Sequence, residues 1–382
     1  MKYMLIAGET SGDLHASRLI NYLRQLDSEA EFRFIGGDLM AKEARVAPDL
    51  HYKEMNVMGF TEVIARLPVI WRSLKLAKRL LLDWRPDVLI LVDYPGFNLK
   101  MAEFAHRHGV RTEYFISPKV WAWKEWRVRK IRKCVDRILS ILPFETAFFE
   151  KRGYKNVVYV GNPSVEEIDH ALGHLAPKKH FLERHGIDDP RPILALLPGS
   201  RRSEIRNNLP VMLEAVRRYP EFQYVVAAAP SMPEKFYREV AQDPGLTVVF
   251  GSTVTLLKYS QAALVTSGTA TLETSLVGTP QVVCYRSNGS RLTYRLMEKI
   301  LKVRFVSLPN LIMGHAMVPE LLLCYCTPAS ISRELSPLLQ PSPHRDRQIT
   351  ACRTLRRRLG TFCAPEYAAE LIYDAIATGD KP

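Results

Sequence analysis

Residues 263–273, ALVTSGTATLE, combine the residue types that bind a diphosphate. An apolar run predicts a buried strand, Ser267, Gly268 and Thr269 predict a turn, and a helical pattern follows. Such a turn offers an anion the free N–H groups and positive end of a helix, and glycine lets a phosphate approach closely. Glu273 could then accept hydrogen bonds from ribose hydroxyls. An ordinary capped helix with a solvated glutamate is the alternative.

A second phosphate-binding candidate is LLPGSRRSEI at residues 196–205. Gly199 and Ser200 can expose backbone donors, and Arg201 can offer a planar pair of N–H groups. With the turn at Ser267, this loop would bracket a nucleotide diphosphate. The alternative is a solvated pair of arginines.

Asn310 lies in a third candidate loop, SLPNL at residues 307–311. Its side chain could reach the nucleotide or the sugar. A turn in which Asn310 bonds to the backbone explains the pattern equally well.

Two carboxylates follow predicted strands in the first half of the chain. Glu9 lies in GETSGD at residues 8–13, which is neither a dinucleotide fingerprint nor a P-loop. A carboxylate would repel a phosphate there, so Glu9 suits a sugar hydroxyl or a proton transfer. Asp93 ends the run before YPGFN, where partial burial would raise its pKa and make it a better base. For both, capping of the next helix is the alternative.

Residues 59–84 have apolar side chains at helical spacing, interspersed with arginine and lysine. This pattern suits a segment that dips into anionic lipid headgroups, and a plain amphipathic core helix is the alternative. The residues we expect to meet acyl chains are Val63, Ile64, Leu67, Ile70 and Leu74.

Residues 121–133 place three of the five tryptophans beside six basic residues. RNA bases could stack on such a segment. It directly follows a predicted strand end at Ser117, so we favour an acceptor pocket or a phosphate clamp.

Short apolar runs, each followed by a turn and a helical pattern, recur along the chain and predict βα units on parallel sheets. They lie at residues 3–7, 32–35, 88–92, 112–116, 138–142, 157–160, 193–197, 224–228, 247–250, 263–265 and 281–284. The rhythm breaks at residues 161–163 and 173–180. We therefore predict two doubly wound α/β domains at residues 1–165 and 166–343, followed by helices in residues 344–382. Ligands of such folds bind beyond the carboxyl ends of the strands.

The composition, with 47% hydrophobic and 24% charged residues among 382, suits a soluble globular protein. No membrane span or signal peptide is apparent, so we expect cytoplasmic residence. The six cysteines include no CxxC pair, and we expect neither a disulfide framework nor a metal site, and no cofactor. A net charge of +13 calls for an anionic partner: nucleic acid, a phosphorylated substrate or an acidic membrane surface.

Taken together, these motifs closely resemble the lipid-A-disaccharide synthase family over nearly the full length. The matching segments are AGETSGD at 7–13, VMGFTEV at 57–63, SPKVWAW at 117–123, LPFE at 142–145, LLPGSR at 196–201, SGTATLE at 267–273 and SLPNL at 307–311. One departure is Gly96, where members often carry a second acid. Asp93 is therefore the acid of that loop.

The resemblance implies a GT-B glycosyltransferase, with two Rossmann-like domains facing a central cleft. It would transfer 2,3-diacylglucosamine from UDP to the 6-hydroxyl of 2,3-diacylglucosamine 1-phosphate, with inversion at the anomeric carbon. Asp93 would be the base, with Glu9 as its rival or orienting partner. Arg201, the turn at Ser267 and Glu273 would hold UDP.

The resemblance further implies a peripheral enzyme on the inner face of the cytoplasmic membrane. In relatives the C-terminal helices can be exchanged between subunits, which is compatible with a homodimer. Two alternatives remain: an isomerase of the same architecture acting on UDP-N-acetylglucosamine, and an RNA-binding protein. The second leaves Glu9 and Asp93 unexplained, and we expect no nucleic acid partner.

Overall fold

The computed structural model describes residues 1–55, 67–122, 124–286 and 304–379. The chain forms two compact units. Unit 1 comprises Met1–Pro163 and Thr361–Pro382, and unit 2 comprises Ser164–Gly360. The chain therefore returns to unit 1 for its last helix.

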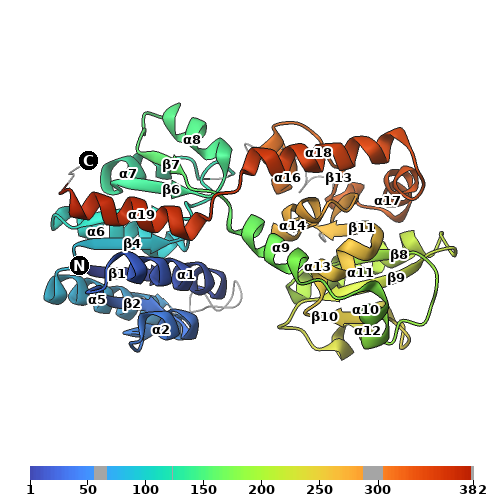
Figure 1. Ribbon diagram of the computed structural model, residues 1–382, viewed down its shortest axis with the longest axis horizontal. Helices are drawn as coiled ribbons and strands as arrows, with labels where there is room; N and C mark the ends of the chain where they lie inside the picture. The colour runs from blue at the N-terminus through green and yellow to red at the C-terminus, as the bar shows by residue number, and fades with distance from the viewer. Residues whose placement is uncertain (56–66, 123, 287–303, 380–382) are drawn as a thin grey trace. The chain divides into compact units, whose positions relative to one another are not determined.

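Unit 1 is built on a parallel sheet of seven strands in the order β3-β2-β1-β4-β5-β6-β7 (Figure 1). The strands are β1 (Lys2–Ala7), β2 (Glu31–Gly36), β3 (Leu50–His51), β4 (Val88–Val92), β5 (Arg111–Phe115), β6 (Arg137–Ser140) and β7 (Val157–Tyr159). The chain order reverses between β1 and β4, where Ala7 pairs with Val92. Such a reversal leaves a crevice at the carboxyl ends of the two strands, which is where doubly wound proteins bind ligands.

Helices cover both faces of this sheet because its strands are apolar on both sides. Tyr3 and Leu5 of β1 pack in one buried cluster, whereas Met4 and Ile6 pack in another. The helices assigned to this unit are α1 (Thr10–Leu26), α2 (Asp38–Ala44), α3 (Tyr52–Met55), α5 (Leu67–Trp84), α6 (Pro95–Arg107), α7 (Arg127–Cys134), α8 (Pro143–Glu150) and α19 (Ala364–Ala377).

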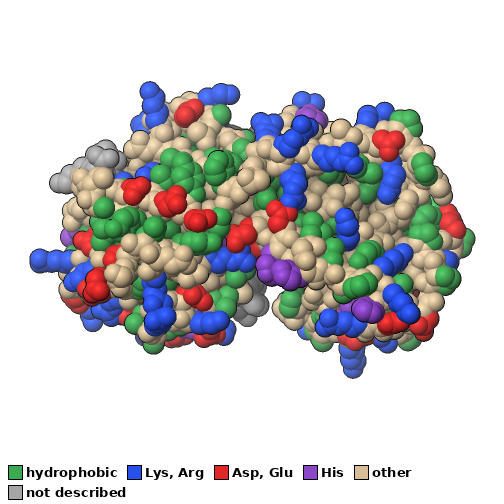
Figure 2. Space-filling view, viewed as in Figure 1, with side chains coloured by type: hydrophobic (Ala, Val, Ile, Leu, Met, Phe, Trp, Pro, Cys, Tyr) green, Lys and Arg blue, Asp and Glu red, His purple; other side chains and the backbone are tan. Residues whose placement is uncertain are grey.

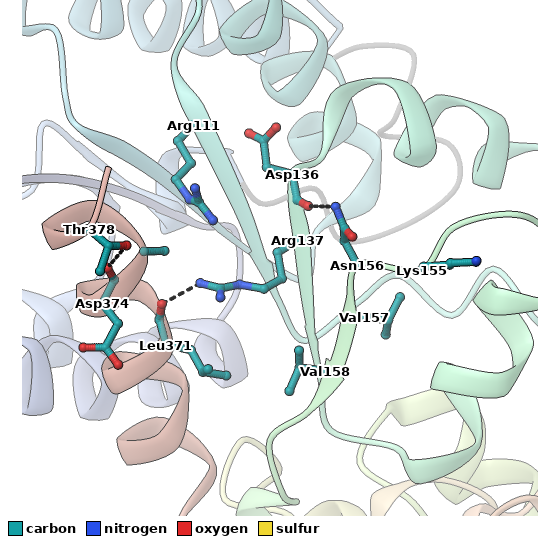
Figure 3. A pocket seen from close by; sticks show the side chains of 11 residues that line it. Arg111, Asp136, Arg137, Lys155, Asn156, Val157, Val158, Leu371, Asp374 and Thr378 are labelled. Carbon is teal, nitrogen blue, oxygen red and sulfur yellow. Dashed lines mark hydrogen bonds between the residues drawn. The ribbon is translucent and has the colours of Figure 1, made fainter. Parts of the chain in front are cut away.

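The last helix, α19, lies beside α1 on one face of this sheet (Figure 1). Arg137 fixes it, because its Nη2 donates to the carbonyl of Leu371 at 2.6 Å while its Nε bonds to the buried carboxylate of Glu113 at 2.9 Å. A cavity of about 560 Å³ lies beside this contact (Figure 3). Arg111 and Arg137 begin their strands, so the cavity is at the amino edge of the sheet, opposite the crevice.

Unit 2 has a parallel sheet of six strands in the order β10-β9-β8-β11-β12-β13. The strands are β8 (Ile193–Leu197), β9 (Gln223–Ala228), β10 (Val248–Phe250), β11 (Ser260–Thr266), β12 (Gln281–Tyr285) and β13 (Glu320–Leu322). Here the order reverses between β8 and β11, where Leu197 pairs with Val265. The second crevice is therefore at the ends of these two strands.

The helical segments of unit 2 surround its sheet. They are α9 (Pro163–Gly173), which begins at the boundary, α10 (Lys178–Arg184), α11 (Arg202–Val216), α12 (Glu234–Ala241), α13 (Thr253–Tyr259), α14 (Thr269–Val277), α16 (Leu308–Met313), α17 (Pro328–Leu335), α18 (Pro343–Leu359) and the short 3-10 helices at Leu323–Tyr325 and Ser336–Leu338. Of the two C-terminal helices, α18 belongs to unit 2 and α19 to unit 1.

The eleven apolar runs all form strands, which confirms the predicted doubly wound α/β pattern. Two edge strands, β3 and β13, were not predicted. They have two and three residues, too few for an apolar run to stand out, and backbone pairing with β2 and β12 defines them.

Candidate functional site

Glu9 and Asp93 lie at the crevice of unit 1, since they follow β1 and β4. Asp93 and Tyr94 have φ angles of 44° and 45°, a left-handed conformation that non-glycine residues adopt at a cost. Gly8 is required beside them because a Cβ there would lie 2.3 Å from the Tyr94 ring. Strain at this point indicates a turn built to present a side chain.

Two buried donors hold the strained turn in place. The hydroxyl of Tyr114 donates to the carbonyl of Asp93 at 2.6 Å, and Nδ2 of Asn98 donates to the same oxygen at 2.8 Å. Both residues are fully buried. The backbone of Asp93 is therefore fixed from β5 and from α6.

The carboxyl group of Asp93 is poised to exchange a proton near neutral pH. Burial raises its pKa to about 6, and the neighbouring charge of Glu9 adds to this effect, while Lys119 opposes it. Once protonated, Asp93 can donate a hydrogen bond to the Glu9 carboxylate, which raises the pKa of Asp93 further. Glu9 occupies the N-cap position of α1 without a side-chain capping bond, and the N-cap of α6 is Tyr94. These contacts favour a paired acid site over simple capping.

Asp13, from the same motif as Glu9, has a structural role. Its buried carboxylate accepts hydrogen bonds from the backbone N–H groups of Gly37, Leu39 and Met40 at 2.8, 3.2 and 3.1 Å. It thus caps α2 from a distance of more than twenty residues.

Glu145 is a buried acid near the crevice that the sequence reasoning did not single out. It follows β6, is fully buried, and accepts a hydrogen bond from Trp121 Nε1 at 2.9 Å. Burial raises its pKa to about 7. The LPFE motif was the available signal, because it places an acid directly after a strand end.

In unit 2 the turn Ser267–Thr269, which we call the α14 turn, presents an open helix N-terminus. It follows β11 at the crevice, and Gly268 is the N-cap of α14. A Cβ placed on Gly268 would meet nothing within 4 Å. Among the described residues, no side chain accepts a hydrogen bond from the N–H groups of Gly268 or Thr269. The turn therefore has the geometry of an anion site.

The corresponding turn after β8, Gly199–Arg201, which we call the α11 turn, differs in its local contacts. One carboxylate oxygen of Glu204 accepts hydrogen bonds from the N–H groups of Ser200 and Arg201 at 3.0 and 3.2 Å. The other accepts from the Arg201 guanidinium at 2.8 Å. Glu204 thus occupies the backbone N–H donors that we expected to bind a phosphate. The exposed Arg201 side chain is the part of this turn that can still contact a ligand.

Glu273 lies one turn into α14. Burial raises its pKa, as does the neighbouring carboxylate of Glu167, while the Thr269 side chain opposes the rise. Asn310, in contrast, is fully buried. Its amide donates to Val318 and Glu320 and accepts from two backbone N–H groups, which supports the turn-forming alternative over contact with the nucleotide.

The segment proposed to meet a membrane is described only from α5 onward. Val63 and Ile64 lie outside the described residues, and the Leu67 side chain is not described. Ile70 packs against the core and Leu74 is buried in it, so these two follow the core-helix alternative. Among the side chains of α5 that the structure describes, the large apolar ones that are exposed are Trp71 and Leu82.

On the face shown in Figure 2, lysine and arginine side chains are scattered rather than gathered in one patch. The helix α18 alone carries six arginines among its seventeen residues. Two of these serve packing: Arg345 donates to backbone carbonyls and Arg356 pairs with Asp169. The net charge therefore does not by itself mark a nucleic acid site.

Solved structures with similar folds define the class of protein. A UDP-N-acetylglucosamine 2-epimerase from Methanocaldococcus jannaschii, in complex with UDP-GlcNAc and UDP, matches with a TM-score of 0.63 at 12% identity, covering 98% of this chain and 100% of that one. The calicheamicin glycosyltransferase CalG4 matches with a TM-score of 0.59 at 15% identity, covering 100% and 99%. At such identities the likeness shows the fold alone, which is that of GT-B glycosyltransferases and related epimerases.

Sequence comparison then identifies the family. The family model described as lipid-A-disaccharide synthetase matches residues 3–370, and the chain belongs to this family. A lipid-A-disaccharide synthase from Myxococcus xanthus is 39% identical over 99% of this chain and 98% of its own length. The corresponding protein from Geobacter metallireducens is 35% identical over 98% and 97%.

This membership confirms the resemblance drawn from the motifs: the chain is a glycosyltransferase of lipid A biosynthesis. The isomerase and RNA-binding alternatives are not favoured. No helix among the described residues is long and apolar enough to cross a membrane.

Proposed function

We propose that Asp93 is the base that deprotonates the 6-hydroxyl of 2,3-diacylglucosamine 1-phosphate. The hydroxyl oxygen forms a bond to the anomeric carbon of the UDP-linked sugar, the bond from that carbon to the diphosphate breaks, and UDP leaves. The proton passes to Asp93. A single displacement of this kind inverts the anomeric carbon.

The observation that carries this proposal is the half-buried Asp93, on a strained turn at the crevice of unit 1, with the exposed Glu9 beside it. Its pKa of about 6 leaves Asp93 ionised at neutral pH while keeping it basic enough to accept a proton. Glu9 is the orienting partner, because its carboxylate can accept a hydrogen bond from Asp93 once Asp93 has taken up the proton.

Exchange of Asp93 for asparagine tests the role of the base. Asp93→Asn should abolish turnover, measured as UDP release in the presence of both acylated sugars, while UDP still binds. Glu9→Gln is the matched variant. A near-normal rate in Asp93→Asn together with an inactive Glu9→Gln would transfer the role of base to Glu9.

For the donor, the α14 turn holds the diphosphate, and Glu273 accepts hydrogen bonds from the ribose. Arg201 adds a guanidinium group to the leaving UDP, which stabilises its developing charge. Gly199 and Ser200 shape the α11 turn. Asn310 braces the loop at Met317 and Val318. Ser267 Oγ of the α14 turn donates to the carbonyl of Val306 at 3.2 Å.

On the acceptor side, α5 provides a face for the inner leaflet of the membrane. Trp71 is 70% exposed and Leu82 is 43% exposed. They share one side of the helix with the exposed Arg72, Lys75 and Arg79. An aromatic ring beside basic residues suits the interface of an anionic membrane.

A vesicle assay tests this face. Trp71→Ser should lower binding to vesicles that contain anionic lipid. Trp126→Ser is the matched control, because Trp126 is 66% exposed but lies outside α5. Equal losses in the two variants, or none in Trp71→Ser, would contradict the assignment.

A further inference from the structure

Glu145 is an ionisable group beyond the carboxyl end of β6, near the crevice of unit 1, to which the proposed mechanism gives no role. Its side chain is 1% exposed, yet both carboxyl oxygens are in use. One accepts from Trp121 Nε1 at 2.9 Å, and the other makes a short hydrogen bond with Ser140 Oγ. Burying an acid costs free energy even when hydrogen bonds offset part of the cost, so a function for Glu145 is expected.

The Trp121 contact anchors the turn that follows β5. Besides its bond to Glu145, the Trp121 ring packs edge-on against Phe144 with a centroid distance of 5.1 Å. Within the turn, the N–H of Val120 donates to Pro118 at 2.6 Å and that of Ala122 donates to Lys119 at 3.2 Å.

Lys119 is the exposed residue of this turn, between neighbours that are buried. It is close enough to affect two acids, since it lowers the pKa of Asp93 and that of Glu145. The backbones also meet here, because the Asp93 N–H donates to the carbonyl of Phe115 at 3.4 Å.

We propose that Glu145 is a positioning residue which, through Trp121, fixes the turn that places Lys119 near Asp93. Lys119 in turn keeps Asp93 ionised for the reaction. The inference rests on the proposed role of Asp93 as the base.

The charges around Asp93 give Lys119 this importance. Glu9 faces Asp93 from the β1 side and raises its pKa. Tyr114 lies against it from β5, and Tyr94 is its neighbour in the chain. Lys119 is the cation that opposes the rise in the Asp93 pKa, together with a hydrogen bond from the backbone N–H of Tyr94. Without Lys119, the Tyr94 bond alone opposes burial and Glu9, and a larger share of Asp93 is protonated at neutral pH.

Either protonation state of Glu145 preserves the anchor. When ionised, Glu145 accepts from both Trp121 and Ser140. When protonated, it can donate to Ser140 Oγ, which then donates to the carbonyl of Leu142 at 3.0 Å. Glutamine imitates the protonated acid, because its oxygen can accept from Trp121 while its NH₂ donates to Ser140. Alanine removes both contacts.

The test is the pH dependence of kcat/KM between pH 5 and 8.5. The wild type should lose activity below a midpoint near the Asp93 pKa of about 6. Lys119→Gln should move this midpoint upward by about one pH unit, whereas Lys119→Arg retains it. Glu145→Ala should move it in the same direction as Lys119→Gln, and Glu145→Gln should leave it in place.

UDP binding and thermal unfolding check that each variant is folded. If Glu145→Ala does not fold, Trp121→Phe replaces it, because it keeps the ring and removes only the N–H donor. An unchanged midpoint in Lys119→Gln overturns the role of Lys119. A Glu145→Ala or Trp121→Phe variant that is slower at every pH with an unchanged midpoint overturns the positioning role.

These outcomes are distinct from failure of the proposed function. An active Asp93→Asn variant that keeps the wild-type midpoint shows that another group is the base. If Asp93→Asn is inactive and the midpoint stays in place in Lys119→Gln, only the present inference fails.

Discussion

The starts of α11 and α14 share one pattern but differ in what occupies their backbone donors. Both helices follow adjacent parallel strands at the crevice of unit 2, and both turns contain a glycine. At α11, the N–H groups of Ser200 and Arg201 are bonded to Glu204. At α14, the acid is Glu273, which lies near the Thr269 side chain, and the N-cap Gly268 has no side-chain capping bond among the described residues.

The position of the acid explains this difference. Glu204 is the third residue of α11, from which a carboxylate can fold back on the N-cap. The third residue of α14 is Thr271, whose hydroxyl donates to the carbonyl of Gly268 at 2.7 Å and so leaves the N–H groups alone. Glu273 is the fifth residue, more than a helical turn from the N-cap. A spacing of two residues therefore decides whether the chain or a ligand occupies such a turn.

The two glycines differ in the same way. Gly199 has a φ angle of 114°, and a Cβ there would lie 2.6 Å from the Cβ of Glu204. Gly268 has extended backbone and open space around it. Gly199 is required by the fold, whereas the absence of a side chain at Gly268 leaves room for a ligand.

Of the substitutions in the two turns, Gly199→Ala should have the largest effect on stability. We expect a loss of about 2–3 kcal/mol in the free energy of unfolding, from the unfavourable φ angle and the contact with Glu204. Urea unfolding followed by circular dichroism measures it. Glu204→Ala is the control, since loss of its cap alone should cost about 1 kcal/mol. A Gly199→Ala variant as stable as the wild type would contradict the assignment.

The contrast between the two turns also shows how far the sequence could lead. The strand, glycine and helix at each turn were predictable from apolar runs and turn residues, as were Glu9 and Asp93 at strand ends. The cap formed by Glu204 could have been found from its position three residues after Arg201.

Other features depend on contacts between distant residues and could not be predicted from local pattern. Asp13 caps α2, which lies more than twenty residues further along the chain. Glu145, which follows β6, accepts a hydrogen bond from Trp121, which follows the neighbouring strand β5. Leu74 could not be assigned to a membrane or to the core, because both environments select the same apolar spacing.

The second effect concerns Gly268. The substitution Gly268→Ala should leave the stability unchanged or slightly higher, because its Cβ meets nothing and alanine restricts the unfolded chain. UDP should bind about tenfold more weakly, a loss of about 1.4 kcal/mol, because the added methyl group occupies the approach to the N–H groups. Isothermal titration with UDP measures this loss. Unchanged affinity would show that the diphosphate does not use the α14 turn.

The smallest effect is a pH dependence at Glu273. Its folded-state pKa is raised, first by burial and then by Glu167, so the folded protein holds this proton more tightly than the unfolded chain. The free energy of unfolding should therefore fall as pH rises from the usual glutamate value through the raised pKa. Glu273→Gln should remove this part of the decline, measured by urea unfolding at a series of pH values.

Bound UDP should weaken the same decline, because ribose hydroxyls donate hydrogen bonds and favour the ionised form of Glu273. Glu204→Gln provides the control from the other turn, since it leaves Glu273 and its ribose contact in place and should retain the effect of UDP. If UDP does not alter the fall in the free energy of unfolding with pH in the wild type, Glu273 does not contact the nucleotide. The comparison would then rest on the backbone of the α14 turn alone.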